Sequence, residues 1–150
     1  MPEREKAVFP RAAGRSSGGL ELRCVIFARK RDAVVLIRHR RHPTAGEAWT
    51  LPGGTLDYGM TPRESAARTL IEQTGVSADS MRLLGVESSS QANWTLLFQF
   101  DARITADPVA GAGIAEVRLE SIERSLAGEL DFLARMQLEK YRIHELSTTA

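Results

Sequence analysis

A short helix with well-marked ends, near the middle of the 150-residue chain, constrains the fold more than any other segment. Thr61 can cap the helix, Pro62 suits its first position, and Glu64 follows Thr61 by three residues, as in a capping box. Gly75 can adopt the left-handed conformation that ends a helix. Small and apolar residues at helical spacing predict the face that packs inward: Ala66, Ala67, Leu70, Ile71 and Thr74.

Segments typical of β-strands lie on both sides of this helix. Residues 20–29 and 33–37 are rich in apolar side chains and are separated by a short polar turn, which predicts a hairpin. Further elements are expected as strands at 49–51, 81–86, 94–100 and 114–119, a short helix at 121–127 and an amphipathic helix at 130–143. Because strands joined by hairpins alternate with helices, the predicted class is α+β, with a mixed sheet flanked by two helices as an α/β/α sandwich.

The length of the chain fits one domain, and its composition fits a globular one. Residues 1–19 are rich in Gly and Ser and are expected to form a flexible N-terminal arm, residues 20–146 the single domain, and residues 147–150 a short tail. Hydrophobic residues make up 43% of the chain and charged residues 26%, which excludes a wholly disordered protein.

Charge, cysteine content and hydropathy exclude several functional classes. The net charge is +1, so no overall field attracts nucleic acid, and no nucleic-acid partner is expected. A single cysteine, Cys24, excludes an intramolecular disulfide and a zinc site built from several cysteines, and it suits a reducing, cytoplasmic location. No apolar run approaches the ~20 residues of a membrane span, so no membrane contact is expected.

The segment from Gly54 to Val76 closely resembles the Nudix box. The family pattern is Gly, five residues, Glu, seven residues, then Arg-Glu-U-x-Glu-Glu-x-Gly-U, where U is a bulky aliphatic residue. The residues that match it in register are Gly54, Arg68, Leu70, Glu72, Gly75 and Val76. The resemblance implies a Nudix fold that hydrolyses a nucleoside diphosphate linked to another moiety, with Mg²⁺ or Mn²⁺ as cofactor.

Three of the four box glutamates are replaced in this sequence. Met60, Thr69 and Gln73 stand at those positions, and Glu72 alone remains. Positions 69, 72 and 73 share one face of the helix, where the family holds its metal ion. Because Mg²⁺ prefers charged, hard oxygen ligands, we expect weak metal binding and weakened hydrolysis.

The resemblance assigns the catalytic role to Glu72 and Arg68, with Arg68 acting mainly by bonding the loop and the glutamates. Glu72 is also the expected metal ligand. Glu87 is a second candidate ligand, because acidic residues outside the box often complete such metal sites in the family. Glu64 and Asp57 are explained more simply, as a capping residue and a turn former.

A basic run precedes the box and could bind phosphate. Arg38, Arg40 and Arg41 end a predicted strand, and guanidinium groups bind phosphate in a bidentate manner. We therefore expect the substrate to contact these arginines together with Gly53 and Gly54. The alternative is a solvated strand end whose charges limit aggregation.

Two functions from different classes remain open. The first is the diphosphate hydrolase that the resemblance implies. The second is an inactive or repurposed module of the same fold that binds a nucleotide, another ligand or a partner without hydrolysis. The replaced glutamates disfavour efficient hydrolysis, whereas the intact loop, cap and Gly75 favour a preserved cleft. The sequence leaves a homodimer open.

Overall fold

The computed structural model describes residues 19–40, 48–90 and 94–149. Within them the elements follow one another as β1 (Leu20–Lys30), β2 (Ala33–His39), β3 (Gly53–Thr55), α2 (Pro62–Thr74), β4 (Ser80–Ser89), β5 (Trp94–Arg103), β6 (Ile114–Ser121), α3 (Ile122–Ala127) and α4 (Phe132–Thr149). In this part of the chain, none of the helices combines the length and apolar character needed to cross a membrane.

The strands form a mixed six-stranded sheet in the order β4-β5-β1-β2-β6, with β3 paired to β1. The β1–β2 hairpin is confirmed, and its strands pair antiparallel. β1 and β5 run parallel along the full length of β5, from Leu20 opposite Trp94 to Arg29 opposite Arg103. The remaining ladders are antiparallel. The predicted mixed sheet is therefore confirmed.

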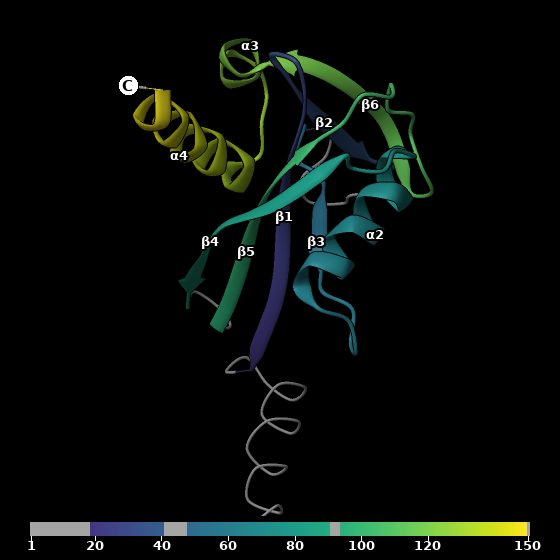
Figure 1. The fold of residues 1–150 in the computed structure, drawn as a ribbon, viewed down its shortest axis with the longest axis vertical. Coiled ribbons are helices and arrows are strands. Elements are labelled where there is room, and N and C mark those ends of the chain that lie inside the picture. Colours follow the sequence, from purple (N-terminus) through teal and green to yellow (C-terminus); the bar gives the residue numbers. More distant parts are fainter. Residues whose placement is uncertain (1–18, 41–47, 91–93, 150) are drawn as a thin grey trace, which may run out of the picture.

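Alternation along β1 divides the core into two layers. Cys24, Ile26 and Ala28 pack in the same cluster as Ala66 and Leu70 of α2. The intervening Val25 and Phe27 pack with Leu138 and Tyr141 of α4. Figure 1 shows α2 and α4 on opposite sides of the sheet, which confirms the sandwich architecture.

Helix α2 has the predicted ends but a slightly different inward face. The Thr61 hydroxyl accepts from the Glu64 amide, the Glu64 carboxylate accepts from the Thr61 amide, and Gly75 is left-handed at φ 74°. The prediction for Ile71 is wrong, since its side chain is 48% exposed. Thr69 is buried instead. The inward stripe therefore runs through positions 65, 66, 69, 70 and 74, one residue away from the predicted one.

Two other boundaries differ from the prediction. Residues 49–51 are not a strand: Trp49 and Thr50 form isolated bridges only, and the strand lies at Gly53–Thr55. It forms there because the segment pairs with β1, a tertiary contact that overrides the weak strand propensity of glycine. Helix α4 continues to Thr149 through most of the expected tail, whereas the expected N-terminal arm lies outside the described residues except for Gly19.

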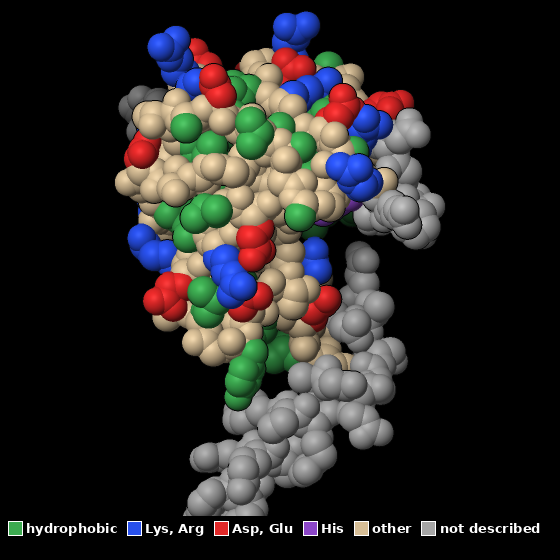
Figure 2. Space-filling model, turned by 90° about the vertical axis from the view of Figure 1, so that its right-hand side faces the viewer, with side chains coloured by type: hydrophobic (Ala, Val, Ile, Leu, Met, Phe, Trp, Pro, Cys, Tyr) green, Lys and Arg blue, Asp and Glu red, His purple; other side chains and the backbone are tan. Residues whose placement is uncertain are grey.

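Charges are mixed over the surface. Figure 2 shows Lys and Arg side chains interspersed with Asp and Glu on the face in view. This distribution agrees with the net charge of +1 and offers no single-sign patch on that face.

Candidate functional site

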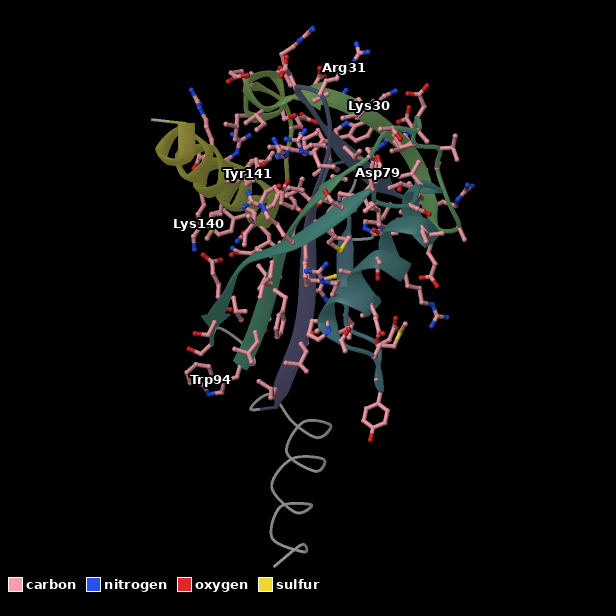
Figure 3. All side chains as sticks on the ribbon, in the orientation of Figure 1. Lys30, Arg31, Asp79, Trp94, Lys140 and Tyr141 are labelled. Atoms are coloured by element: carbon pink, nitrogen blue, oxygen red, sulfur yellow. The ribbon has the colours of Figure 1, made fainter. Side chains whose placement is uncertain are left out.

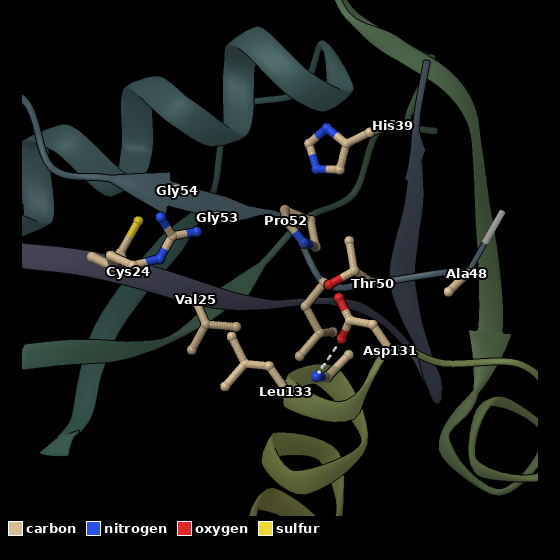
Figure 4. A pocket seen from close by; sticks show the side chains of 13 residues that line it. Cys24, Val25, His39, Ala48, Thr50, Pro52, Gly53, Gly54, Asp131 and Leu133 are labelled. Atoms are coloured by element: carbon tan, nitrogen blue, oxygen red, sulfur yellow. Dashed lines mark hydrogen bonds between the residues drawn. The ribbon is translucent and has the colours of Figure 1, made fainter. Parts of the chain in front are cut away.

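A pocket of about 130 Å³ lies where β1, β3 and the start of α4 meet. Figure 4 shows its wall and the side chains that reach it. The lining residues are Arg23, Cys24 and Val25 from β1, His39 from β2, Ala48 and Thr50–Gly54 from the segment before α2, and Asp131, Leu133 and Ala134 from the start of α4.

Backbone hydrogen bonds fix the segment that forms one wall of the pocket. Thr50 and Ile37 exchange two bonds of 2.8 Å, which tie the segment to β2. The Trp49 amide donates to the Glu129 carbonyl at 3.0 Å, and the Asp131 amide donates to the Trp49 carbonyl at 2.9 Å. The wall is therefore held between the sheet and the start of α4.

Gly53 and Gly54 form the rim of the pocket beside α2. A Cβ on Gly53 would lie 2.3 Å from the carbonyl oxygen of Cys24, so only glycine fits against β1. A Cβ on Gly54 would meet nothing within 4 Å. The space above the Gly54 Cα is therefore open, while its backbone pairs with Cys24 of β1.

Gln73 of α2 binds both polar groups of the Gly53 backbone. Its Oε1 accepts from the Gly53 amide at 3.0 Å, and its Nε2 donates to the Gly53 carbonyl at 3.0 Å. The side chain thus ties the rim of the pocket to the helix. The sequence had indicated only that position 73 lacks the negative charge of the family glutamate.

Glu72 and Arg68 lie on the exposed side of the same helix. Arg68 Nε donates to Glu72 Oε2 at 3.0 Å, and both side chains are more than half exposed. Arg68 Nη1 also lies 3.9 Å from the Met60 sulfur. The structure thus brings together the two residues that were assigned to catalysis, as an i, i+4 ion pair.

Glu87 lies on the other face of the sheet. It is opposite Leu97 in the β4–β5 ladder, and Leu97 belongs to the core layer beneath α4. Its carboxylate accepts from Gln137 at 2.9 Å and pairs with Lys140, which Figure 3 labels on α4. The structure therefore does not bring Glu87 to Glu72, contrary to the expectation that both hold one ion.

The basic run is only partly described, and the arginines in it that are described do not line the pocket. Arg38 pairs with Glu116, and its guanidinium lies 5.6 Å from the centre of the Trp49 ring. Arg40 is exposed, with its amide bonded to the Gly113 carbonyl. Arg41 lies outside the described residues. The residue of this strand end that reaches the pocket is His39.

Comparison with known proteins identifies the family. A family model described as NUDIX domain matches residues 20–141. The chain belongs to the Nudix family. Over 69 residues this Nudix chain is 35% identical to diphosphoinositol polyphosphate phosphohydrolase 3-alpha of Homo sapiens, a match covering 45% of the chain and 40% of the relative. Over 60 residues it is 37% identical to ADP-ribose pyrophosphatase of Methanocaldococcus jannaschii, covering 40% and 35%. Each match spans less than half the length of the relative.

Solved structures share the Nudix fold at low sequence identity. The MutT protein from Methanosarcina mazei Go1 superposes with a TM-score of 0.73 at 21% identity, over 85% of this chain and 96% of that one. The Nudix domain of Shewanella oneidensis NrtR, complexed with ADP ribose, gives 0.72 at 21% identity, over 96% and 98%. These likenesses confirm the predicted architecture.

The side chains on this Nudix helix do not fit the metal site that the family pattern implies. Mg²⁺ prefers several hard oxygen ligands, with carboxylates among them. Thr69 is buried, Gln73 is engaged by Gly53, and Glu72 alone supplies a carboxylate on this face. Over the described ranges, no group of three or more His, Cys, Asp or Glu side chains is placed to hold a metal ion.

Sequence reasoning missed two charged groups of the pocket. Arg23 interrupts the apolar run of β1 and lines the pocket. Asp131 lines it as well, and its carboxylate accepts from the Ala134 amide at 2.7 Å, capping α4. An Asp before an amphipathic run is a signal for a helix start, which could have located Asp131. Cys24 is buried, and burial raises the pKa of its thiol, which lowers the fraction present as the nucleophilic thiolate.

Proposed function

We propose that this Nudix domain binds a nucleoside diphosphate linked to another moiety at the Gly53–Gly54 rim, and that it hydrolyses the ligand poorly or not at all. The observation that carries the proposal is the contact between Gln73 and Gly53. It preserves the shape of the rim, while the helix face keeps a single carboxylate, Glu72. The domain thus keeps a surface that can bind the nucleotide, but it lacks the several carboxylates that would hold a catalytic metal ion.

The class of ligand is supported by the family and by the chemistry of the pocket. The relatives named above are a diphosphoinositol polyphosphate phosphohydrolase and an ADP-ribose pyrophosphatase, and the NrtR domain was crystallised with ADP ribose. The pocket offers the Arg23 guanidinium to a phosphate, with apolar contacts from Val25 and Leu133. Its volume of about 130 Å³ is below the ~300–1,000 Å³ of whole ligand sites. It therefore takes one part of such a ligand, and the rest lies along the rim.

A second candidate, slow hydrolysis dependent on Mg²⁺ or Mn²⁺, is favoured by the position of Glu72. The Arg68–Glu72 pair is more than half exposed, and pairs of this kind contribute at most about 1 kcal/mol. Glu72 can therefore leave Arg68 at little cost. Turnover with a single carboxylate is expected to be slow.

Calorimetric titration of ADP-ribose into the wild type and two arginine variants tests the proposal. Arg23→Ala removes a guanidinium that lines the pocket, and we expect the affinity to fall about ten-fold, as for a lost charge-assisted hydrogen bond. Arg38→Ala is the matched control, because Arg38 does not line the pocket and pairs with Glu116 outside it. Equal losses in the two variants, or no binding by the wild type, would contradict the proposal.

A further inference from the structure

The Gln73 side chain completes the free edge of β3. Within the described residues, β3 pairs with β1 alone, and the preceding Pro52 carbonyl accepts from the Ile26 amide. The amide and carbonyl of Gly53 are bonded instead to Gln73, each at 3.0 Å. The side-chain amide therefore pairs with Gly53 as the backbone of a neighbouring strand would.

Among side chains of this size, only an amide can make both contacts. Gln carries one acceptor oxygen and a donor NH₂ group, whereas an ionised Glu has acceptors alone. A glutamate at position 73 could still accept from the Gly53 amide. Its second oxygen would then face the Gly53 carbonyl oxygen, an arrangement that a cation between the two oxygens would stabilise.

The charges along α2 agree with a rim that needs no cation. Arg63 and Arg68 balance Glu64 and Glu72 along the helix, so their formal charges cancel. Glu64 is committed to the cap and Glu72 to Arg68. A diphosphate that approaches this helix meets no excess negative charge that a divalent ion would have to offset.

We infer that the Gln73 amide replaces a divalent cation at the pocket rim, so that this domain binds its diphosphate ligand independently of metal. Gln73 is in this sense a positioning residue, since it acts through Gly53. The inference rests on the proposed function for the identity of the ligand. Its structural part, a rim held without a cation, can be tested on the ligand-free protein.

The experiment compares the wild type with Gln73→Glu, Gln73→Ala and a charge control, Ile71→Glu. Ile71 is 48% exposed on the same turn, so its variant adds the same charge without touching Gly53. ADP-ribose affinity is measured by calorimetry in EDTA and in Mg²⁺. Thermal melts of the ligand-free proteins are recorded in the same two buffers.

The wild type and Ile71→Glu should bind ADP-ribose with affinities that agree within about two-fold in the two buffers. In EDTA, Gln73→Glu should bind about ten-fold more weakly, because the Gly53 carbonyl loses its donor. Mg²⁺ should restore its affinity and raise its melting temperature. Gln73→Ala should bind weakly in both buffers and show no response to Mg²⁺.

Two results would overturn the inference. The first is wild-type binding that EDTA weakens about ten-fold or more. The second is a rise in melting temperature with Mg²⁺ that is as large for the wild type as for Gln73→Glu. If the wild type binds no ADP-ribose in either buffer, the proposed function fails, and the melts alone decide whether Gln73 replaces a cation.

Discussion

Truncation of two neighbouring aliphatic residues on α2 should have very different effects on stability. Leu70 is fully buried and packs in the layer that contains Ile26 and Phe100. Leu→Ala changes in cores cost about 2–5 kcal/mol, and for this enclosed site we expect about 3 kcal/mol. Ile71 is 48% exposed, so Ile71→Ala should cost about 1 kcal/mol or less, since full burial of such a side chain contributes about 1.5–3 kcal/mol.

Urea unfolding followed by tryptophan fluorescence measures both variants against the wild type. A difference of about 2 kcal/mol between Leu70→Ala and Ile71→Ala corresponds to about 4–8 °C in melting temperature for a domain of this size. Equal losses would mean that α2 is rotated about its axis relative to the structure. The contacts of Thr69 and Gln73 described above would then be wrong as well.

Three further results are expected. Thr69→Glu combined with Gln73→Glu should lower stability without metal, because Thr69 is only 8% exposed and the variant places a charge there. Saturating Mg²⁺ should raise the melting temperature of this double variant, because an ion that binds only the folded state stabilises it. A melting temperature that Mg²⁺ leaves unaltered would show that the loop geometry has also diverged from the family. Gly53→Ala should cost about 1–3 kcal/mol in urea unfolding, because its Cβ would approach the Cys24 carbonyl oxygen to 2.3 Å. Burial raises the pKa of the Cys24 thiol, so the unfolded state loses its proton first and stability should fall as the pH rises past the pKa of an unfolded cysteine. Denaturation curves of Cys24→Ala should lack that part of the alkaline decline.

Local signals in the sequence predicted the ends of α2, whereas its orientation depends on distant contacts. The capping box and Gly75 act within a few residues of the helix ends, so the sequence alone located them. The inward face is selected by packing against β1 and β5, which periodicity does not describe to within one residue. Ile71 shows the result, since it continues the apolar pattern but lies outside the packed stripe.

The site was predictable where its residues form one continuous motif. Gly54, Arg68 and Glu72 were located by their spacing, and the last two form the expected ion pair. Glu87 was chosen by analogy with the family and expected just after a strand ending at residue 86. It lies within β4 instead, where a register shift between Leu83 and Gly85 changes which side chains share a face.

Two other contacts of the site depend on tertiary partners that spacing cannot supply. Arg38 is engaged by Glu116, which follows it by more than seventy residues. The bond between Gln73 and Gly53 likewise joins helix α2 to strand β3. Neither contact leaves a periodic signal in the sequence.

Phosphorus NMR on one sample of protein and ADP-ribose tests the central claim most directly, because it reports binding and hydrolysis together. We predict that the diphosphate resonances shift or broaden equally in EDTA and in Mg²⁺, and that they persist after overnight incubation with a stoichiometric amount of protein. Replacement of these resonances by phosphomonoester signals in Mg²⁺ but not in EDTA, at a rate that Glu72→Gln abolishes, would contradict the account. It would show that Glu72 and the remaining oxygen ligands suffice for metal-dependent hydrolysis.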